Sequence, residues 1–164
     1  MRKNLSVAII GIGVLTMFKP TRILVPTDMS DHSLRAIRLG FDIASKFEAE
    51  VFLLHVIQNP VQECVLEYCL NEDLIEALKV EMFESSRKGM RQQLSRFPWI
   101  DADAVSVDVR TGIPYEEILT AAEEHEIDLI VIASLGATGL AKYLMGGVVR
   151  QVLLGAKCSV LLTK

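Results

Sequence analysis

The residues best suited to chemistry in this sequence are glycines near an apolar run that ends at Ser134. Gly136 follows that run, and the pair Gly146 and Gly147 stands where a second apolar, helix-like segment begins. The first N–H groups of a helix lack intrahelical acceptors and lie at the positive end of its dipole, so they attract phosphate. Glycine leaves such groups uncovered, and Lys142 can add a positive charge. The pattern predicts a phosphate site built from main-chain amides.

The spacing of these glycines differs from that of two common nucleotide loops. Neither G-x-G-x-x-G nor G-x-x-x-x-G-K-[ST] occurs at this place, which argues against a dinucleotide fingerprint and against a P-loop. A purely structural role is the alternative, because glycine also serves tight turns and close helix–strand packing. The glycines alone leave both interpretations open.

Five short apolar segments must position this loop, and each is typical of a buried strand. They alternate with segments of helical periodicity, which predicts an α/β fold: a doubly wound parallel sheet of five strands with helices on both faces. Ligands of such sheets bind at the carboxyl ends of the strands, where the strand order reverses. The expected strands are 21–26, 50–57, 104–109, 128–134 and 158–163.

Three segments are expected to line this crevice. Pro26, Thr27 and Asp28 follow the first strand, Val56 lies near the end of the second, and Ala133 and Ser134 precede the glycine loop.

Neighbouring polar residues have simpler expected roles. Asp28 can hold Mg²⁺ through water, although one carboxylate is little evidence for a metal. Ser30 or Asp31 is expected to cap the next helix. For His55 we expect an imidazole satisfied by the backbone rather than a catalytic group.

Length, charge and cysteine content narrow the class of protein. The 164 residues suffice for one domain. A net charge of −4 argues against nucleic acid as a partner. Cys64, Cys69 and Cys158 have neither metal-binding nor redox spacing. We interpret them as small hydrophobic residues in a reducing compartment, which predicts cytoplasmic localisation.

Residues 1–18 form an apolar N-terminal extension to a domain of residues 19–164. The extension begins with two cations, as a signal peptide does, but no small-x-small cleavage site precedes Lys19. It is also shorter than the ~20 residues that span a bilayer. Three interpretations stay open: a start at Met17 or a disordered extension, an ordered extra element, or membrane targeting through residues 5–18.

From residue 21 to the C-terminus the chain resembles the universal stress protein (UspA) family. RILVPTDMS (22–30) is similar to the first strand and turn of that family, and FLLHVI (52–57) to its second strand. GIPYEEI (112–118) is similar to its G-x-P-x-x-x-I turn. ASLGATGLAKYLMGG (133–147) occupies the place of its ATP loop, G-x-x-G-x(9)-G-[ST].

The resemblance implies the strand order 3-2-1-4-5 and a homodimer, commonly through the last strand, here 158–163. In the ATP-binding branch, the residue matching Asp28 holds the adenosine end and the backbone at Val56 meets the adenine. The triphosphate rests on amides at Gly136, Gly146 and Gly147, and we include the next residue, Val148, in the predicted site.

Two residues depart from the family loop. Ala133 replaces its first glycine, and Gly147 replaces its final Ser or Thr. The missing hydroxyl is worth about 1 kcal/mol, less than the ~1.4 kcal/mol of a tenfold change in affinity. We therefore expect ATP binding that is weakened rather than abolished, and ADP or AMP can compete.

The sequence thus favours a nucleotide-binding regulator or switch of the stress response. Two alternatives stay open. One is a dimeric interaction protein of the same fold that has lost nucleotide binding, and the other is a slow ATP hydrolase.

Overall fold

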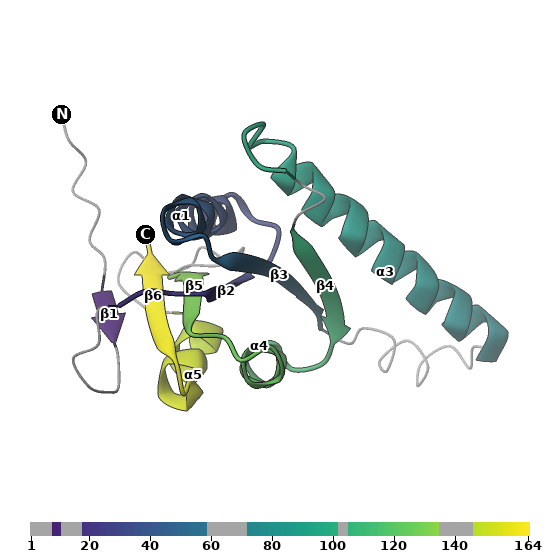
Figure 1. Ribbon diagram of the computed structural model, residues 1–164. Coiled ribbons are helices and arrows are strands. Elements are labelled where there is room, and N and C mark those ends of the chain that lie inside the picture. The colour runs from purple at the N-terminus through teal and green to yellow at the C-terminus, as the bar shows by residue number, and fades with distance from the viewer. Residues whose placement is uncertain (1–7, 11–17, 59–71, 102–104, 135–145) are drawn as a thin grey trace.

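One sheet lies at the centre of this computed structural model, which describes residues 8–10, 18–58, 72–101, 105–134 and 146–164 (Figure 1). Six strands join the sheet within these residues, in the order β1-β6-β5-β2-β3-β4. Their bounds are β1 Ala8–Ile10, β2 Arg22–Pro26, β3 Glu50–Ile57, β4 Ser106–Thr111, β5 Leu129–Ala133 and β6 Ser159–Thr163.

Strands β2 to β6 form the predicted parallel sheet. β2 pairs with β3 on one side and β5 on the other, β4 lies beyond β3, and β6 lies beyond β5. Counted without β1, this is the order 3-2-1-4-5, so the predicted topology is confirmed. β1 is an addition that the predicted sheet did not include: it pairs antiparallel with β6.

Helices cover both faces of the sheet, as predicted (Figure 1). α1 (Asp31–Phe47) and α3 (Glu72–Leu94) cover one face, and α4 (Pro114–Glu124) and α5 (Gly147–Gly155) cover the other. Successive residues of β2 point to opposite faces, so Ile23 packs with α1 and α3 whereas Leu24 packs with α4 and α5. Both residues are fully buried, because a parallel strand between two helical layers has no solvent face.

One predicted strand is displaced along the chain. The segment expected at 104–109 forms β4 at Ser106–Thr111, and Ala104 lies outside the described residues. Thr111, which lies beyond the expected strand, pairs with Ile57, and the Gly112 N–H group donates to the Ile57 carbonyl at 3.1 Å. The pairing with β3 continues to Ile57 and so extends β4 to Thr111. A local sequence pattern does not record which residues of two strands lie side by side.

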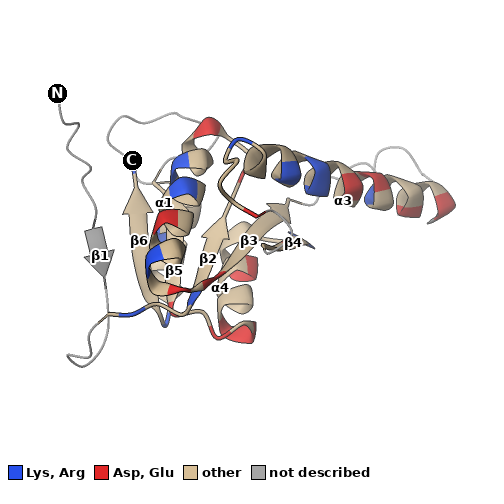
Figure 2. Ribbon diagram, turned by 45° about the horizontal axis from the view of Figure 1, so that its top comes forward, with Lys and Arg blue, Asp and Glu red and all other residues tan. Residues whose placement is uncertain are grey.

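No helix in the described ranges has both the length and the apolar character needed to cross a membrane. Acidic and basic residues alternate along α1, whereas α3 carries mostly acidic residues in its N-terminal part and basic residues toward its C-terminal end (Figure 2).

Candidate functional site

The strand order reverses between β2 and β5. From β2 the chain proceeds outward to β3 and β4, and it then returns to β5 and β6 on the other side of β2. β2 and β5 are parallel neighbours, with Ile23 beside Leu129 and Leu24 beside Ile130. Their carboxyl ends therefore lie at the same edge of the sheet, where ligands of doubly wound folds bind.

The loop after β2 holds Asp28 at this edge. The N–H group of the buried Thr27 donates to the Leu54 carbonyl at 2.8 Å, which anchors the loop to β3. Asp28 is exposed, and its Oδ1 accepts from the Ser30 N–H group at 3.1 Å and from the Ser30 hydroxyl at 2.6 Å. Ser30 also caps α1 by accepting from the Ser33 N–H group, as predicted. The loop thus orients a carboxylate next to a helix start.

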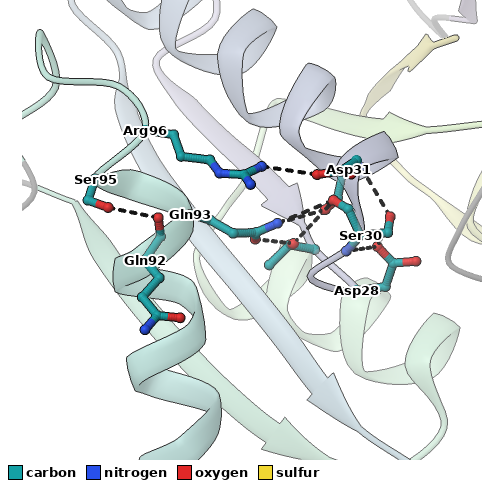
Figure 3. A network of polar contacts seen from close by, with 9 residues as sticks. Asp28, Ser30, Asp31, Gln92, Gln93, Ser95 and Arg96 are labelled. Atoms are coloured by element: carbon teal, nitrogen blue, oxygen red, sulfur yellow. Dashed lines mark hydrogen bonds and ion pairs between the residues drawn. The ribbon is translucent and has the colours of Figure 1, made fainter.

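A buried amide ties this loop to α3 (Figure 3). The Thr27 hydroxyl lies 2.7 Å from Oε1 of Gln93 and 2.9 Å from the Ser33 hydroxyl. The Gln93 side-chain amide donates to the Ser33 hydroxyl at 3.2 Å and to the Ser30 carbonyl at 3.3 Å. Because buried polar groups are costly when unpaired, this network fixes the shape of the loop.

Sequence reasoning did not single out Gln93. The sequence does contain a sign of its role: Gln93 is a polar residue on the helix face that also carries Met90 and Leu94, both of which are buried. Nearby, an ion pair of 3.0 Å joins Arg96 to Asp31 at the start of α1 (Figure 3).

His55 and Val56 lie at the end of β3 next to this loop. The His55 Nδ1 atom lies 2.8 Å from the Thr27 carbonyl oxygen, so the predicted backbone partner of this imidazole is confirmed. Val56 is half-buried and pairs with Arg110 of β4. Pro26 is buried as the last residue of β2. The predicted adenosine-side residues are thus all placed at the carboxyl edge.

The start of α5 lies against the end of β5. Ala133 is the last residue of β5, and the next residue, Ser134, donates its N–H group to the Thr163 carbonyl at 2.8 Å. The Ser134 carbonyl accepts from the Gly146 N–H group at 3.3 Å. The predicted residues Gly136 and Lys142 lie outside the described residues.

This contact changes the predicted role of Gly146. Its N–H group already has an internal acceptor, so it is not a free donor for a phosphate. The N–H groups of Gly147 and Val148 open the helix, and no acceptor for them exists in the described ranges. Of the predicted residues at the start of α5, Gly147 and Val148 therefore keep an available N–H group, whereas Gly146 does not.

The packing around the two glycines does not explain why they are glycines. A Cβ atom at Gly146 would lie 3.8 Å from the Ser134 carbonyl oxygen, an ordinary contact, and one at Gly147 would have no described atom within 4 Å. By contrast, a Cβ atom at Gly155 would lie 2.5 Å from Leu119 of α4. Close helix packing accounts for Gly155, whereas the described residues leave open space at Gly147.

No group of three metal-ligating side chains exists in the part of the chain that the structure describes. The carboxyl edge offers Asp28 as a carboxylate, and hydrated Mg²⁺ with a nucleotide phosphate is the form of metal that one such group suits.

A hollow of about 250 Å³ lies at the opposite, amino end of the strands. Leu119, Ala122, Gly155 and Cys158 are among its lining residues. Burial raises the pKa of the Cys158 thiol, so the reactive thiolate is disfavoured there. This hollow is not part of the predicted site.

Comparison with known proteins identifies relatives of this arrangement. Two proteins of Methanocaldococcus jannaschii are similar in sequence. Universal stress protein MJ0531 is 32% identical over 144 residues, which is 87% of this chain and 81% of that protein. Universal stress protein MJ0577 is 30% identical over 156 residues, covering 87% of this chain and 94% of that protein.

Solved structures share the fold. The structure of MJ0577 superposes with a TM-score of 0.73 at 28% identity, covering 90% of this chain and 97% of that one. A universal stress protein solved in complex with cAMP superposes with a TM-score of 0.66 at 22% identity, covering 90% and 99%. The family model of the Universal stress protein family matches residues 19–164. By sequence profile, by relatives and by topology, this chain belongs to the universal stress protein family.

Proposed function

We propose that this protein binds an adenine nucleotide (ATP, ADP or AMP) at the carboxyl edge of its sheet and acts as a cytoplasmic regulator or switch of the stress response. The observation that carries the proposal is the start of α5, where the N–H groups of Gly147 and Val148 have no acceptor among the described residues. Donors at a helix start attract phosphate, and no described atom lies within 4 Å of the place that a Cβ atom at Gly147 would take.

Each end of the crevice would bind a different part of the nucleotide. Pro26, Thr27 and Asp28 would hold the adenosine end, and the Val56 backbone would meet the adenine. Ala133 and Ser134 would form the floor between the two ends. Gly147 and Val148 would receive the phosphates, with Gly146 shaping the helix start.

Three further contributions belong to the proposal. Gly136 and Lys142, outside the described residues, would complete the phosphate site. Mg²⁺ would reach Asp28 through water. One structural relative was solved in complex with cAMP, which supports the adenine-nucleotide class of ligand.

Equilibrium binding of fluorescent ATP, with and without Mg²⁺, tests the proposal directly. We expect Gly147→Val to weaken binding more than tenfold, because a branched side chain would cover the donors without disturbing a described neighbour. Gly147→Ser should tighten binding about fivefold, since one hydroxyl hydrogen bond contributes about 1 kcal/mol. Equal affinity of both variants and the wild type would place the phosphate site elsewhere.

A dimeric interaction protein without a nucleotide is the second candidate. The engaged Gly146 N–H group favours it, as do Ala133 and Gly147 where the family loop has Gly and Ser or Thr. A folded protein that binds none of ATP, ADP and AMP would select this candidate. Phosphate release under turnover conditions would instead identify a slow hydrolase.

We also propose that residues 1–18 are an extension to a domain of residues 19–164, and that two copies associate through the last strand, 158–163. β1 pairs with that strand in the present structure. Association through β6 therefore requires that β1 leave its place.

A further inference from the structure

The outer edge of β6 can be identified from its hydrogen bonds to β5. The Ser159 N–H group donates to the Asp128 carbonyl at 3.3 Å, and the Thr163 carbonyl accepts from the Ser134 N–H group at 2.8 Å. Both groups thus point toward β5. Because the main-chain groups of successive strand residues point in opposite directions, those of Val160 and Leu162 point to the outer edge.

β1 occupies this edge. Ala8 lies beside Leu162, Ile9 beside Leu161 and Ile10 beside Val160 in an antiparallel register. Since Val160 and Leu162 point outward, the pairs with Ala8 and Ile10 are the hydrogen-bonded ones. Ile9 then directs its own N–H group away from β6. Three residues of β1 therefore satisfy the outer edge of an apolar strand.

A second copy of β6 fits the same edge. Two antiparallel β6 strands related by a two-fold axis at Leu161 would pair Val160 of each copy with Leu162 of the other. Those are the hydrogen-bonding groups that β1 already uses. An uncovered apolar edge strand is a template for another strand, so β1 and a second chain compete for one set of donors and acceptors.

We infer that β1 is an internal cap on the self-association edge of β6, and that a second copy of this chain takes that edge when β1 is released. A tethered strand competes at an effective concentration of about millimolar, well above usual concentrations of a second chain. The capped chain is therefore monomeric, and loss of the cap makes it dimeric. The inference rests on the proposed association through β6 and is independent of nucleotide binding.

Two proline variants of the full chain test the cap. Ile10→Pro removes a donor to β6, whereas Ile9→Pro removes a donor that points away from β6 and serves as the matched control, since proline is tolerated where a strand N–H group faces solvent. We expect sedimentation equilibrium to give the mass of one chain for the wild type and Ile9→Pro. Ile10→Pro should shift to the mass of two chains as its concentration rises.

Hydrogen exchange locates the contact. The amides of Val160 and Leu162 should exchange slowly in the wild-type monomer, quickly in dilute Ile10→Pro, and slowly again in its dimer.

Each other outcome overturns one part of the inference. A wild-type dimer in solution would show that β1 does not cap the chain, while leaving association through β6 intact if Val160 and Leu162 are protected only in the dimer. A monomeric Ile10→Pro with fast exchange at these amides would show that β6 is not an association edge. Equal behaviour of Ile9→Pro and Ile10→Pro would contradict the assigned hydrogen bonds.

Discussion

Gly147 is the residue on which the nucleotide proposal depends most. Its N–H group begins α5, its backbone lies next to the end of β5, and no described atom would contact a Cβ atom there. A packing glycine such as Gly155 has a neighbour within 3 Å of that position. The two glycines look alike in the sequence, and only their surroundings distinguish the proposed ligand site from a packing contact.

The reactivity of the Cys158 thiol is also set by the surroundings of a single residue. Burial raises the pKa of its thiol, and the nearby Asp128 carboxylate adds to the rise. The thiolate is the reactive form, so at mildly alkaline pH the folded protein should react with iodoacetamide more slowly than the unfolded chain, with the rate rising at higher pH. Peptide mass spectrometry in buffer and in urea measures the two rates for this cysteine. Equal rates would show that the thiol is not buried in solution.

At the scale of elements, the contact between α1 and β2 positions the loop that carries Asp28. Gly40 of α1 faces Val25 of β2, and a Cβ atom at Gly40 would lie 2.7 Å from Cγ2 of Val25. Val25 is fully buried and branched at Cβ, so it has no room to move aside. The spacing of helix and strand therefore depends on this glycine.

We predict that Gly40→Ala lowers the free energy of unfolding by about 1–2 kcal/mol, because overpacking outweighs the gain in helix propensity. Gly147→Ala is the matched control. With no described neighbour, it should leave stability unchanged or raise it by up to about 1 kcal/mol. Urea denaturation of both variants measures the difference. A stable Gly40→Ala would mean that α1 can shift on the sheet without cost.

The polar network at Gln93 joins α3 to the same loop. Gln93→Leu removes the amide that contacts Thr27, Ser30 and Ser33, and we predict a loss of about 1–3 kcal/mol in unfolding free energy. Gln92→Leu, at the exposed neighbouring position, should have little effect. If the nucleotide proposal holds, Gln93→Leu should also weaken ATP binding, because Asp28 sits on the loop that the network fixes. Chemical denaturation and ATP titration check both parts.

At the scale of the whole molecule, the reversal of strand order between β2 and β5 creates the candidate site. Neither strand carries all of it: one supplies the Asp28 loop and the other leads to the start of α5. Acidic and basic residues alternate along α1 (Figure 2), and the formal net charge of the whole chain is −4. Nucleic-acid binding, which depends on clustered cations, gains no support from this pattern.

We predict that a bound nucleotide stabilises the whole protein against unfolding. A nucleotide that binds only the folded chain raises the unfolding free energy by about 2.7 kcal/mol at a hundredfold excess over Kd. We expect ATP to raise the Tm of the wild type and to have a much smaller effect on Gly147→Val at the same concentration. Differential scanning calorimetry measures both shifts. If ATP raised the Tm of both proteins equally, the contact that stabilises the protein would not lie at the start of α5.

The sequence by itself determined the topology of this protein. Apolar strands alternating with helical segments, together with the right-handed crossover, leave few arrangements, and the motifs at 22–30, 52–57, 112–118 and 133–147 pointed to one family. It also placed Asp28 and Gly147 at strand and helix ends, since local caps and turns depend on near neighbours. Ser30 was predictable for the same reason, because it caps the helix that begins at the next residue.

Only the tertiary structure decided what depends on residues far apart in the chain. The amide of Gln93 meets Thr27 across 66 positions, and the Gly146 N–H group finds its acceptor at Ser134. The pairing of β1 with β6 joins residues 8–10 to residues 160–162. A residue pattern records which groups need partners, but the folding of the whole chain selects which partners they find.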